Sequence, residues 1–187
     1  MIERIKHQLF KWFAPVMVYR FKRADGVVLK NTRTSNCTLI GNRENLKIDD
    51  NVFIGHFNFI DCSNGLSIGE GCQITNYVSV LTHSSHIAIR LYGRSYQNVK
   101  NKKAYGSGSV SIGAYTFIGP HSVIMPDTKI GKGCLVSAFS YVKGEFPDFS
   151  IIAGNPAKIV GDTREMDMPY LEENPELKEF YNEWINR

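Results

Sequence analysis

Residues 110–142 read VSIGAYTFIGPHSVIMPDTKIGKGCLVSAFSYV, and an aliphatic residue returns at every sixth position of this stretch. The returning residues are Ile112, Ile118, Ile124, Ile130, Val136 and Val142. An amphipathic helix has a period of about 3.6 residues and a half-buried strand a period of about 2, so neither explains the spacing. A solenoid does, because each six-residue unit can form a short strand and a corner, and three such units complete one coil.

The same period runs through an earlier stretch, residues 48–80, with one two-residue skip at Leu66-Ser-Ile68, and a fainter start lies at Val28, Thr34 and Ile40. If these aliphatic residues point into a triangular prism, they stack along three walls. The walls are Ile48, Ile68, Ile112 and Ile130; then Ile54, Ile74, Ile118 and Val136; then Ile60, Val80, Ile124 and Val142. A β-sandwich, with turns about every 8–12 residues, fits this spacing less well. The pattern predicts an all-β solenoid.

Glycines and one interruption mark the course of the solenoid. Each of five glycines directly follows an inward aliphatic residue, where we expect a tight or left-handed corner: Gly55, Gly69, Gly113, Gly119 and Gly131. The period breaks over residues 86–109, a polar stretch rich in Tyr, Arg, Lys and Asn. Loops of this length are commonly functional or disordered. We therefore expect one loop that protrudes from the prism.

Helical patterns stand at both ends of the chain. Apolar residues recur at helical spacing over residues 2–17, with Arg and Lys beside them, which predicts an amphipathic helix that either caps the prism or touches an anionic membrane surface. Asn174-Pro175-Glu176 is typical of a helix start and predicts a helix over residues 175–185. The predicted organisation is a lead-in over 1–27, a solenoid domain over 28–160 with the insertion 86–109, and a C-terminal extension over 161–187.

Composition narrows the class of protein. A chain of 187 residues with 43% hydrophobic and 21% charged residues is typical of one soluble domain. It has no run of about 20 apolar residues and no signal peptide pattern, so we expect a cytoplasmic location. The four cysteines form no CxxC pair and predict neither a zinc cluster nor a redox motif: Cys37, Cys62, Cys72 and Cys134.

The net charge of +4 is unevenly distributed. Residues 1–30 hold seven Lys and Arg against two acids, whereas residues 161–187 hold eight acids against three Lys and Arg. The basic excess is local and no nucleic-acid-binding motif accompanies it, so we expect no nucleic-acid partner.

Two further motifs identify what the repeats resemble. They are Val80-Leu-Thr-His-Ser-Ser-His86, just before the insertion, and Ile152-Ala-Gly-Asn-Pro-Ala-Lys158. With the repeats, they resemble the hexapeptide-repeat O-acetyltransferases, a family that includes galactoside and maltose acetyltransferases and enzymes that acetylate surface polysaccharides. The resemblance covers roughly residues 28–160. It implies a left-handed parallel β-helix, an acetyl-CoA co-substrate, no metal, and a homotrimer with active sites between subunits.

The resemblance also implies a catalytic histidine at the end of a coil, directly ahead of the loop. His86 is the first choice by that placement, and His83 is the alternative. A sugar hydroxyl is a poor nucleophile at neutral pH, and an imidazole can accept its proton as the oxygen attacks a thioester. Acceptor contacts are expected in the preceding coil, at His56, Asn58, Asp61 and Asn64.

Coenzyme A is expected along the later coils. By the resemblance, the backbone at Pro120 and Ala138 contacts the pantetheine arm and Phe117 lines the thioester site. Lys143, Lys158 and the turn that contains Asn155 meet the phosphates or the adenine, where a lysine acts as a compact positive charge.

Several readings of the function stay open at this point. The first is acetylation of a sugar hydroxyl, in a surface polysaccharide or its lipid-linked precursor. The second is acetylation of the amine of an amino sugar or an antibiotic on the same fold. A metal-dependent lyase like the γ-class carbonic anhydrases and a non-catalytic scaffold are alternatives of other classes. The HxxxxH pair of zinc-binding histidines found in those lyases is absent from the sequence. The motifs at residues 80–86 and 152–158 count against a non-catalytic scaffold.

Overall fold

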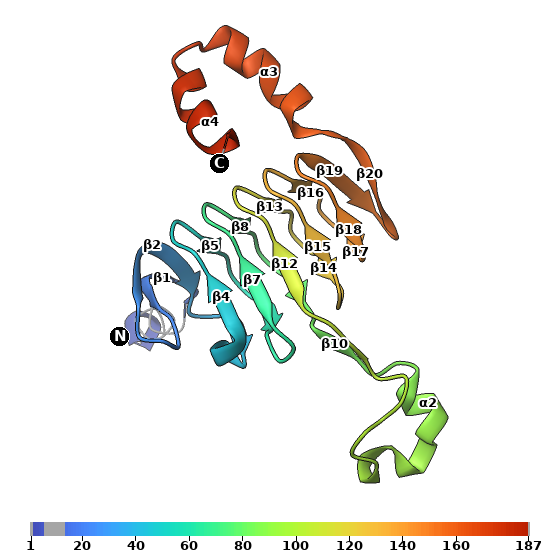
Figure 1. Cartoon of the computed structure of the whole chain (residues 1–187). Helices are drawn as coiled ribbons and strands as arrows, with labels where there is room; N and C mark the ends of the chain where they lie inside the picture. The colour runs from blue at the N-terminus through green and yellow to red at the C-terminus, as the bar shows by residue number, and fades with distance from the viewer. Residues whose placement is uncertain (1, 6–13, 187) are drawn as a thin grey trace.

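The computed structural model describes residues 2–5 and 14–186, and it shows a left-handed parallel β-helix of triangular cross-section (Figure 1). We call its three sheets walls A, B and C. Wall A has eight strands, in the order β1 (Met17–Lys22), β2 (Val28–Ser35), β5 (Phe53–Ile54), β8 (Gln73–Ile74), β13 (Phe117–Ile118), β16 (Leu135–Val136), β19 (Ser150–Gly154) and β20 (Ala157–Asp162). Wall B holds β3 (Leu39–Gly41), β6 (Phe59–Asp61), β9 (Ser79–Val80), β14 (Val123–Ile124) and β17 (Tyr141–Val142). Wall C holds β4 (Leu46–Ile48), β7 (Leu66–Ile68), β12 (Val110–Ile112), β15 (Lys129–Ile130) and β18 (Glu145–Phe146).

The predicted walls are confirmed. Ile68 pairs with Ile48 and Ile112 on wall C, Ile74 pairs with Ile54 and Ile118 on wall A, and Val80 pairs with Ile60 and Ile124 on wall B. These side chains are buried and form one continuous core along the prism axis. Each coil therefore buries its aliphatic residues only against its neighbours and against the other walls.

Corners between the walls carry the loops. Corner AB comprises residues 36–38, 55–58, 75–78, 119–122 and 137–140; corner BC comprises 42–45, 62–65, 81–109, 125–128 and 143–144; corner CA comprises 49–52, 69–72, 113–116, 131–134 and 147–149. A tight or a left-handed corner was expected at the five glycines, and the left-handed conformation does not occur at them. It occurs two residues later, for example at Tyr115 and His121. The glycines are needed for close approach instead, because a Cβ at Gly113 would lie 2.4 Å from the backbone nitrogen of Lys132.

The N-terminal prediction needs correction. Residues 2–5 are helical, but residues 14–16 are not, and β1 begins at Met17, so a helix over 2–17 is wrong at its C-terminal end. The apolar positions Leu9 and Trp12 lie outside the described residues. The repeat is in register from Thr34 and Ile40, which pair with Ile54 and Ile60. Val28 instead belongs to the antiparallel β1–β2 hairpin, whose Phe21 and Leu29 close the N-terminal end of the core.

The C-terminal extension folds back over corner CA. Helix α3 (Thr163–Glu173) follows β20 and was not expected from the sequence; the Asp162 carboxylate caps it by accepting from the Arg164 N–H. Helix α4 (Leu177–Ile185) lies within the predicted 175–185 but begins at Leu177. The Asn174 side chain does not cap it and donates to the Tyr170 carbonyl of α3 instead.

The insertion has structure of its own. The antiparallel strands β10 (His83–Ser84) and β11 (Gly106–Ser107) form its stem. Beyond them lie α2 (Ala88–Tyr92) and the 3₁₀ segment η2 (Gly93–Asn98), and Figure 1 shows this loop reaching away from the prism. A further 3₁₀ turn, η1 (Arg43–Asn45), lies in corner BC. The predicted protruding loop is confirmed.

Among the residues that the structure describes, no helix has the length and apolarity required to cross a membrane. The four cysteines are free, and three of them are buried. Burial raises the pKa of the Cys62 and Cys72 thiols to about 12, so these thiols stay protonated at neutral pH and are poor nucleophiles.

Candidate active site

His83 stands at the root of the protruding loop, directly above a buried carboxylate. Strands β6 and β9 pair in parallel, with Ile60 beside Val80, so Asp61 at the end of β6 faces Thr82 and His83 after β9. One Asp61 oxygen, Oδ2, accepts from His83 Nδ1 at 2.8 Å, from the Thr82 N–H at 3.1 Å and from the Thr82 hydroxyl at 2.6 Å. Ser63 adds a backbone N–H at 3.0 Å to the other oxygen.

These hydrogen bonds keep Asp61 ionised. Asp61 is only 5% exposed, and burial alone would raise its pKa. The donors from Thr82 and Ser63 outweigh burial and hold the pKa well below its usual range. The carboxylate is therefore charged at neutral pH.

The Asp61 carboxylate fixes the imidazole of His83. A carboxylate can only accept a hydrogen bond, so Nδ1 of His83 carries the proton and, in the neutral ring, Nε2 is left as an acceptor. The Tyr105 ring, from the return strand of the loop, stacks on the imidazole with ring centres 5.8 Å apart. The His83 side chain remains 41% exposed. It is thus oriented on one side and open to a substrate on the other.

His86, the first choice from the sequence, has different surroundings. It lies after β10, is exposed, and its Nδ1 contacts the Ser84 hydroxyl at 2.7 Å. A hydroxyl neither fixes a tautomer nor stabilises an imidazolium as a carboxylate does. Of the two candidate histidines, only His83 contacts a carboxylate.

The expected acceptor contacts fall into two groups. Asn64 lies next to the histidine, because its side chain donates to the Ser63 hydroxyl, which is 3.2 Å from His83 Nδ1. Ser63 and Asn64 also line a hollow of about 380 Å³ in corner BC, together with Glu44, Asn45, Lys47 and Gly65. Asp61 is also at the site, but it is buried against His83 and is not open to an acceptor.

His56 and Asn58 belong to corner AB and are not brought to His83. Asn58 is 3% exposed; its amide donates to the Gly55 carbonyl and accepts from the Val78 N–H, so it holds the corner together. These contacts engage Asn58 within its own corner, and its contact with an acceptor stays a prediction. The His56 imidazole contacts the Ser35 hydroxyl at 2.7 Å.

Two of the residues expected to bind coenzyme A share corner AB. Pro120 and Ala138 occupy this corner in successive coils, and the Pro120 carbonyl accepts from the Phe139 N–H. The turn between β19 and β20, which carries Asn155, is tied to the same corner because the Gly154 N–H donates to the Ser140 hydroxyl. Lys158 lies in β20, where it pairs with Ala153.

Phe117 and Lys143 lie apart from that corner. The Phe117 side chain is exposed on wall A, in β13, and Lys143 is exposed in corner BC. Wall B thus separates the corner that carries His83 from the corner that carries Pro120 and Ala138.

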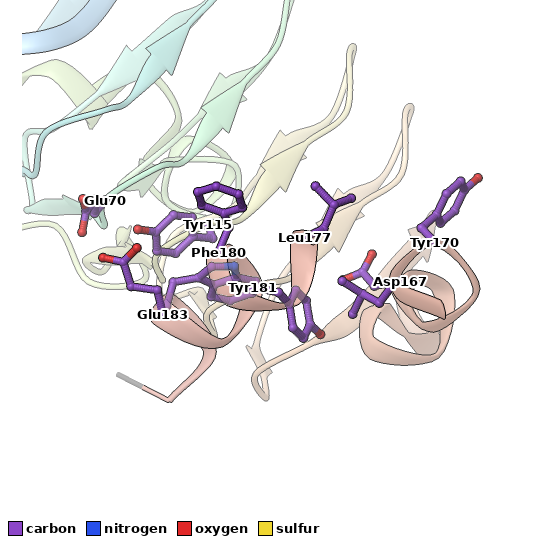
Figure 2. Close-up of a pocket in the computed structure, with 10 residues that line it drawn as sticks. Glu70, Tyr115, Asp167, Tyr170, Leu177, Phe180, Tyr181 and Glu183 are labelled. Atoms are coloured by element: carbon purple, nitrogen blue, oxygen red, sulfur yellow. The ribbon is translucent and has the colours of Figure 1, made fainter. Parts of the chain in front are cut away.

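In the part of the chain that the structure describes, neither a metal cluster nor the aromatic hollow beside helices α3 and α4 involves the candidate histidines. Among residues 2–5 and 14–186, no group of three or more His, Cys, Asp or Glu side chains is arranged to hold a metal ion. A hollow of about 540 Å³ lies between corner CA and helices α3 and α4, lined by aromatic and acidic side chains such as Tyr115, Trp184 and Asp167 (Figure 2). Its lining contains neither candidate histidine.

Residues 109–144 match the family model of the bacterial transferase hexapeptide, with six repeats. The chain belongs to the hexapeptide-repeat acetyltransferase family. Over 128 residues this hexapeptide-repeat chain is 32% identical to serine acetyltransferase 4 of Arabidopsis thaliana, covering 68% of the chain and 33% of that relative. Over 112 residues it is 30% identical to the "Putative lipopolysaccharide biosynthesis O-acetyl transferase WbbJ" of Escherichia coli strain K12, covering 59% of the chain and 57% of that relative. It therefore spans between one third and somewhat over half of the length of these two relatives.

A solved structure supports the fold. The crystal structure of AntD, an N-acyltransferase from Bacillus cereus in complex with dTDP and 3-hydroxybutyryl-CoA, superposes with a TM-score of 0.55. The alignment covers 77% of this chain and 88% of AntD at 23% identity. At that identity the likeness shows the fold of the hexapeptide-repeat chain and leaves its acceptor open.

Thr82 and Tyr105 are site residues that the sequence did not single out. Thr82 had a usable signal, since it directly precedes His83. Tyr105 had none, because its place beside the imidazole depends on the β10–β11 stem closing the loop.

Proposed function

We propose that this protein transfers an acetyl group from acetyl-CoA to a hydroxyl of a sugar, with His83 as general base. The observation that carries the proposal is the pair formed by the partly exposed His83 and the buried Asp61, whose Oδ2 lies 2.8 Å from His83 Nδ1. The kinship with an O-acetyl transferase of lipopolysaccharide biosynthesis supports a saccharide acceptor.

The chemistry follows from the tautomer that Asp61 imposes. Nε2 of His83 accepts the proton of the acceptor hydroxyl while the hydroxyl oxygen bonds to the thioester carbonyl carbon. The Asp61 carboxylate stabilises the imidazolium that forms. The tetrahedral intermediate then collapses, the carbon–sulfur bond breaks, and the imidazolium returns the proton to the sulfur of coenzyme A. The acetyl ester and free coenzyme A are the products.

The placement of the two candidate surfaces supports a homotrimer. His83 lies in corner BC, whereas Pro120 and Ala138 lie in corner AB, on the other side of wall B, and Lys158 lies in β20 of wall A. A second copy whose corner AB meets corner BC of the first would bring the donor to the histidine. We expect light scattering to give the mass of a trimer; the mass of a monomer would leave His83 without a donor surface and refute this arrangement.

Release of free thiol from acetyl-CoA, followed over a panel of sugars, oligosaccharides and amino sugars, tests the activity. We expect His83→Ala to lower kcat about 10²–10⁴-fold, the usual contribution of a general base. His86→Ala, the matched change three residues away, should keep most of the activity. Full activity of His83→Ala would refute the assignment, and loss only in His86→Ala would return the role to that residue. Turnover of amino sugars alone would replace the hydroxyl acceptor by an amine.

A further inference from the structure

The protruding loop carries a strong positive charge without any acidic residue. We call residues 85–105, between β10 and β11, the arm. The arm holds five Lys and Arg and no Asp or Glu: Arg90, Arg94, Lys100, Lys102 and Lys103. The arm thus carries +5 where the whole chain carries +4, so the remainder of the chain carries −1. A concentration of one sign of charge on one projection favours an anionic partner.

Within residues 2–5 and 14–186, no ion pair neutralises an arm cation. Among the described residues, the ion pairs are Arg23–Asp25, His83–Asp61, Lys129–Glu145 and Arg164–Asp162, and none includes an arm residue. Arg90 and Lys102 do make hydrogen bonds, but to the carbonyls of His86 and Val99, which leave their charge in place. Their charge is available to an external group.

Exposed aliphatic side chains accompany these cations. Leu91 is 67% exposed, Ile89 45% and Ile87 41%, and all three lie in or next to α2, far out on the arm (Figure 1). A soluble phosphate or a free polyanion would engage the cations and leave these side chains in water. A membrane interface takes both, because aliphatic groups enter the acyl boundary while Lys and Arg meet the anionic headgroups.

We propose that the arm docks on an anionic lipid surface and thereby places the site beside an acceptor anchored in that surface. The stem of the arm contains His83 itself, in β10, and Tyr105 stacks on the imidazole at 5.8 Å. A docked arm would therefore hold the general base near the membrane, where a lipid-linked saccharide is presented. The docking stands on charge and exposure alone; only the nature of the acceptor rests on the proposed function.

Sedimentation of the full-length protein with vesicles tests the docking. We expect binding to vesicles that contain phosphatidylglycerol and little binding to pure phosphatidylcholine. Each arm cation should contribute about fivefold to the partition coefficient, so Arg94→Gln/Lys103→Gln should lower it about 25-fold. Ile89→Ser/Leu91→Ser should lower it at least about tenfold. Lys30→Gln/Lys178→Gln, which removes two exposed cations elsewhere, should leave it unchanged.

Other variants separate this inference from its alternatives. His83→Ala should bind vesicles like the wild type even if it is inactive, so failure of the catalytic proposal leaves the docking result readable. If the aliphatic pair has no effect while the cation pair does, the partner is a polyanion and lipid docking is refuted. If Lys6→Gln/Lys11→Gln abolishes binding and the arm variants do not, the basic N-terminus docks instead. If the aliphatic pair changes the oligomeric mass, those side chains belong to a subunit interface and the proposal is overturned.

Discussion

Replacing the Asp61 carboxylate by an amide tests the catalytic pair most directly. In Asp61→Asn the side chain keeps its shape, but one carboxylate oxygen becomes an NH₂ group. If that group takes the place of Oδ2, it donates to His83 Nδ1, so the neutral imidazole carries its proton on Nε2. A protonated Nε2 cannot accept a proton from the acceptor. We expect kcat to fall about 10²–10⁴-fold, the range of general-base catalysis.

The same substitution has a cost in stability that the structure bounds. The NH₂ group would face the buried Thr82 N–H, and turning the amide round would place it against the Ser63 N–H instead. A buried donor left without an acceptor costs about 1–3 kcal/mol, so we expect the free energy of unfolding to fall by about that amount. Urea titration followed by circular dichroism measures it.

Asp50→Asn is the matched control. Asp50, in corner CA, also accepts hydrogen bonds from backbone N–H groups, at Asn31 and Asn51, and from the Thr32 hydroxyl. Its replacement should destabilise the protein without touching His83. Kinetics on both variants then separate the effects: in Asp61→Asn, kcat falls while the KM for acetyl-CoA stays near the wild-type value. Equal loss of kcat in the two variants, or full kcat in Asp61→Asn, would show that Asp61 does not position the imidazole.

The pH dependence of stability follows from the same carboxylate. The pKa of Asp61 in the folded protein lies well below the value of about 3.9 expected for an unfolded chain. Its contribution is therefore fully present above about pH 4 and is lost as the pH falls through the folded pKa. The difference in unfolding free energy between wild type and Asp61→Asn should shrink from pH 7 to pH 3; a difference that grows toward acid would contradict this reasoning.

Three further outcomes are expected. Ile118→Ala, at a fully buried position on wall A, should lower the unfolding free energy by about 2–5 kcal/mol in urea titration. Gly113→Ala should lower the thermal midpoint well below that of the wild type, because its Cβ would lie 2.4 Å from the backbone of the next coil. Gly106→Ala is the control and should lower the midpoint only slightly, because the nearest atom to its Cβ is 3.4 Å away. Equal midpoints for the two variants would contradict the close approach. His83→Ala and Lys158→Ala, each weakly active alone, should regain thiol release when refolded together, because a mixed trimer can join one intact histidine to one intact lysine; no gain would argue against sites shared between subunits.

The walls were predictable because stacking repeats the same burial at each coil. Ile54, Ile74 and Ile118 must all point inward for any of them to be buried. An aliphatic residue at every sixth position is therefore best explained by a solenoid. The corners were less predictable. The sequence predicted a tight or left-handed backbone at the corner glycines, and only the position of the neighbouring coil shows that Gly113 is needed for close approach.

The sequence identified individual residues of the site but not the contact between Asp61 and His83. Asp61 and His83 were both singled out, but in different roles, because only the parallel register of β6 and β9 places one under the other. Helix α3 was missed although Asp162 and Glu165 form a helix-start pattern; Pro169 inside the segment argues against a helix in sequence terms. The prediction of a helix up to residue 17 was wrong because Met17 pairs with Ser35 in the β1–β2 hairpin, and this pairing overrides the local helical pattern.

The stacking of the coils also sets a length along the prism. His83 follows the coil that contains β8, and the turn with Asn155 follows β19, which is three strands further along wall A. With neighbouring strands about 4.8 Å apart, these two levels differ by about 14 Å along the axis. Inserting or removing one complete coil between them would change that separation by about 4.8 Å and leave every side chain near His83 untouched. The number of coils therefore sets the length that a bound molecule needs in order to extend from the terminal turn to the level of the histidine.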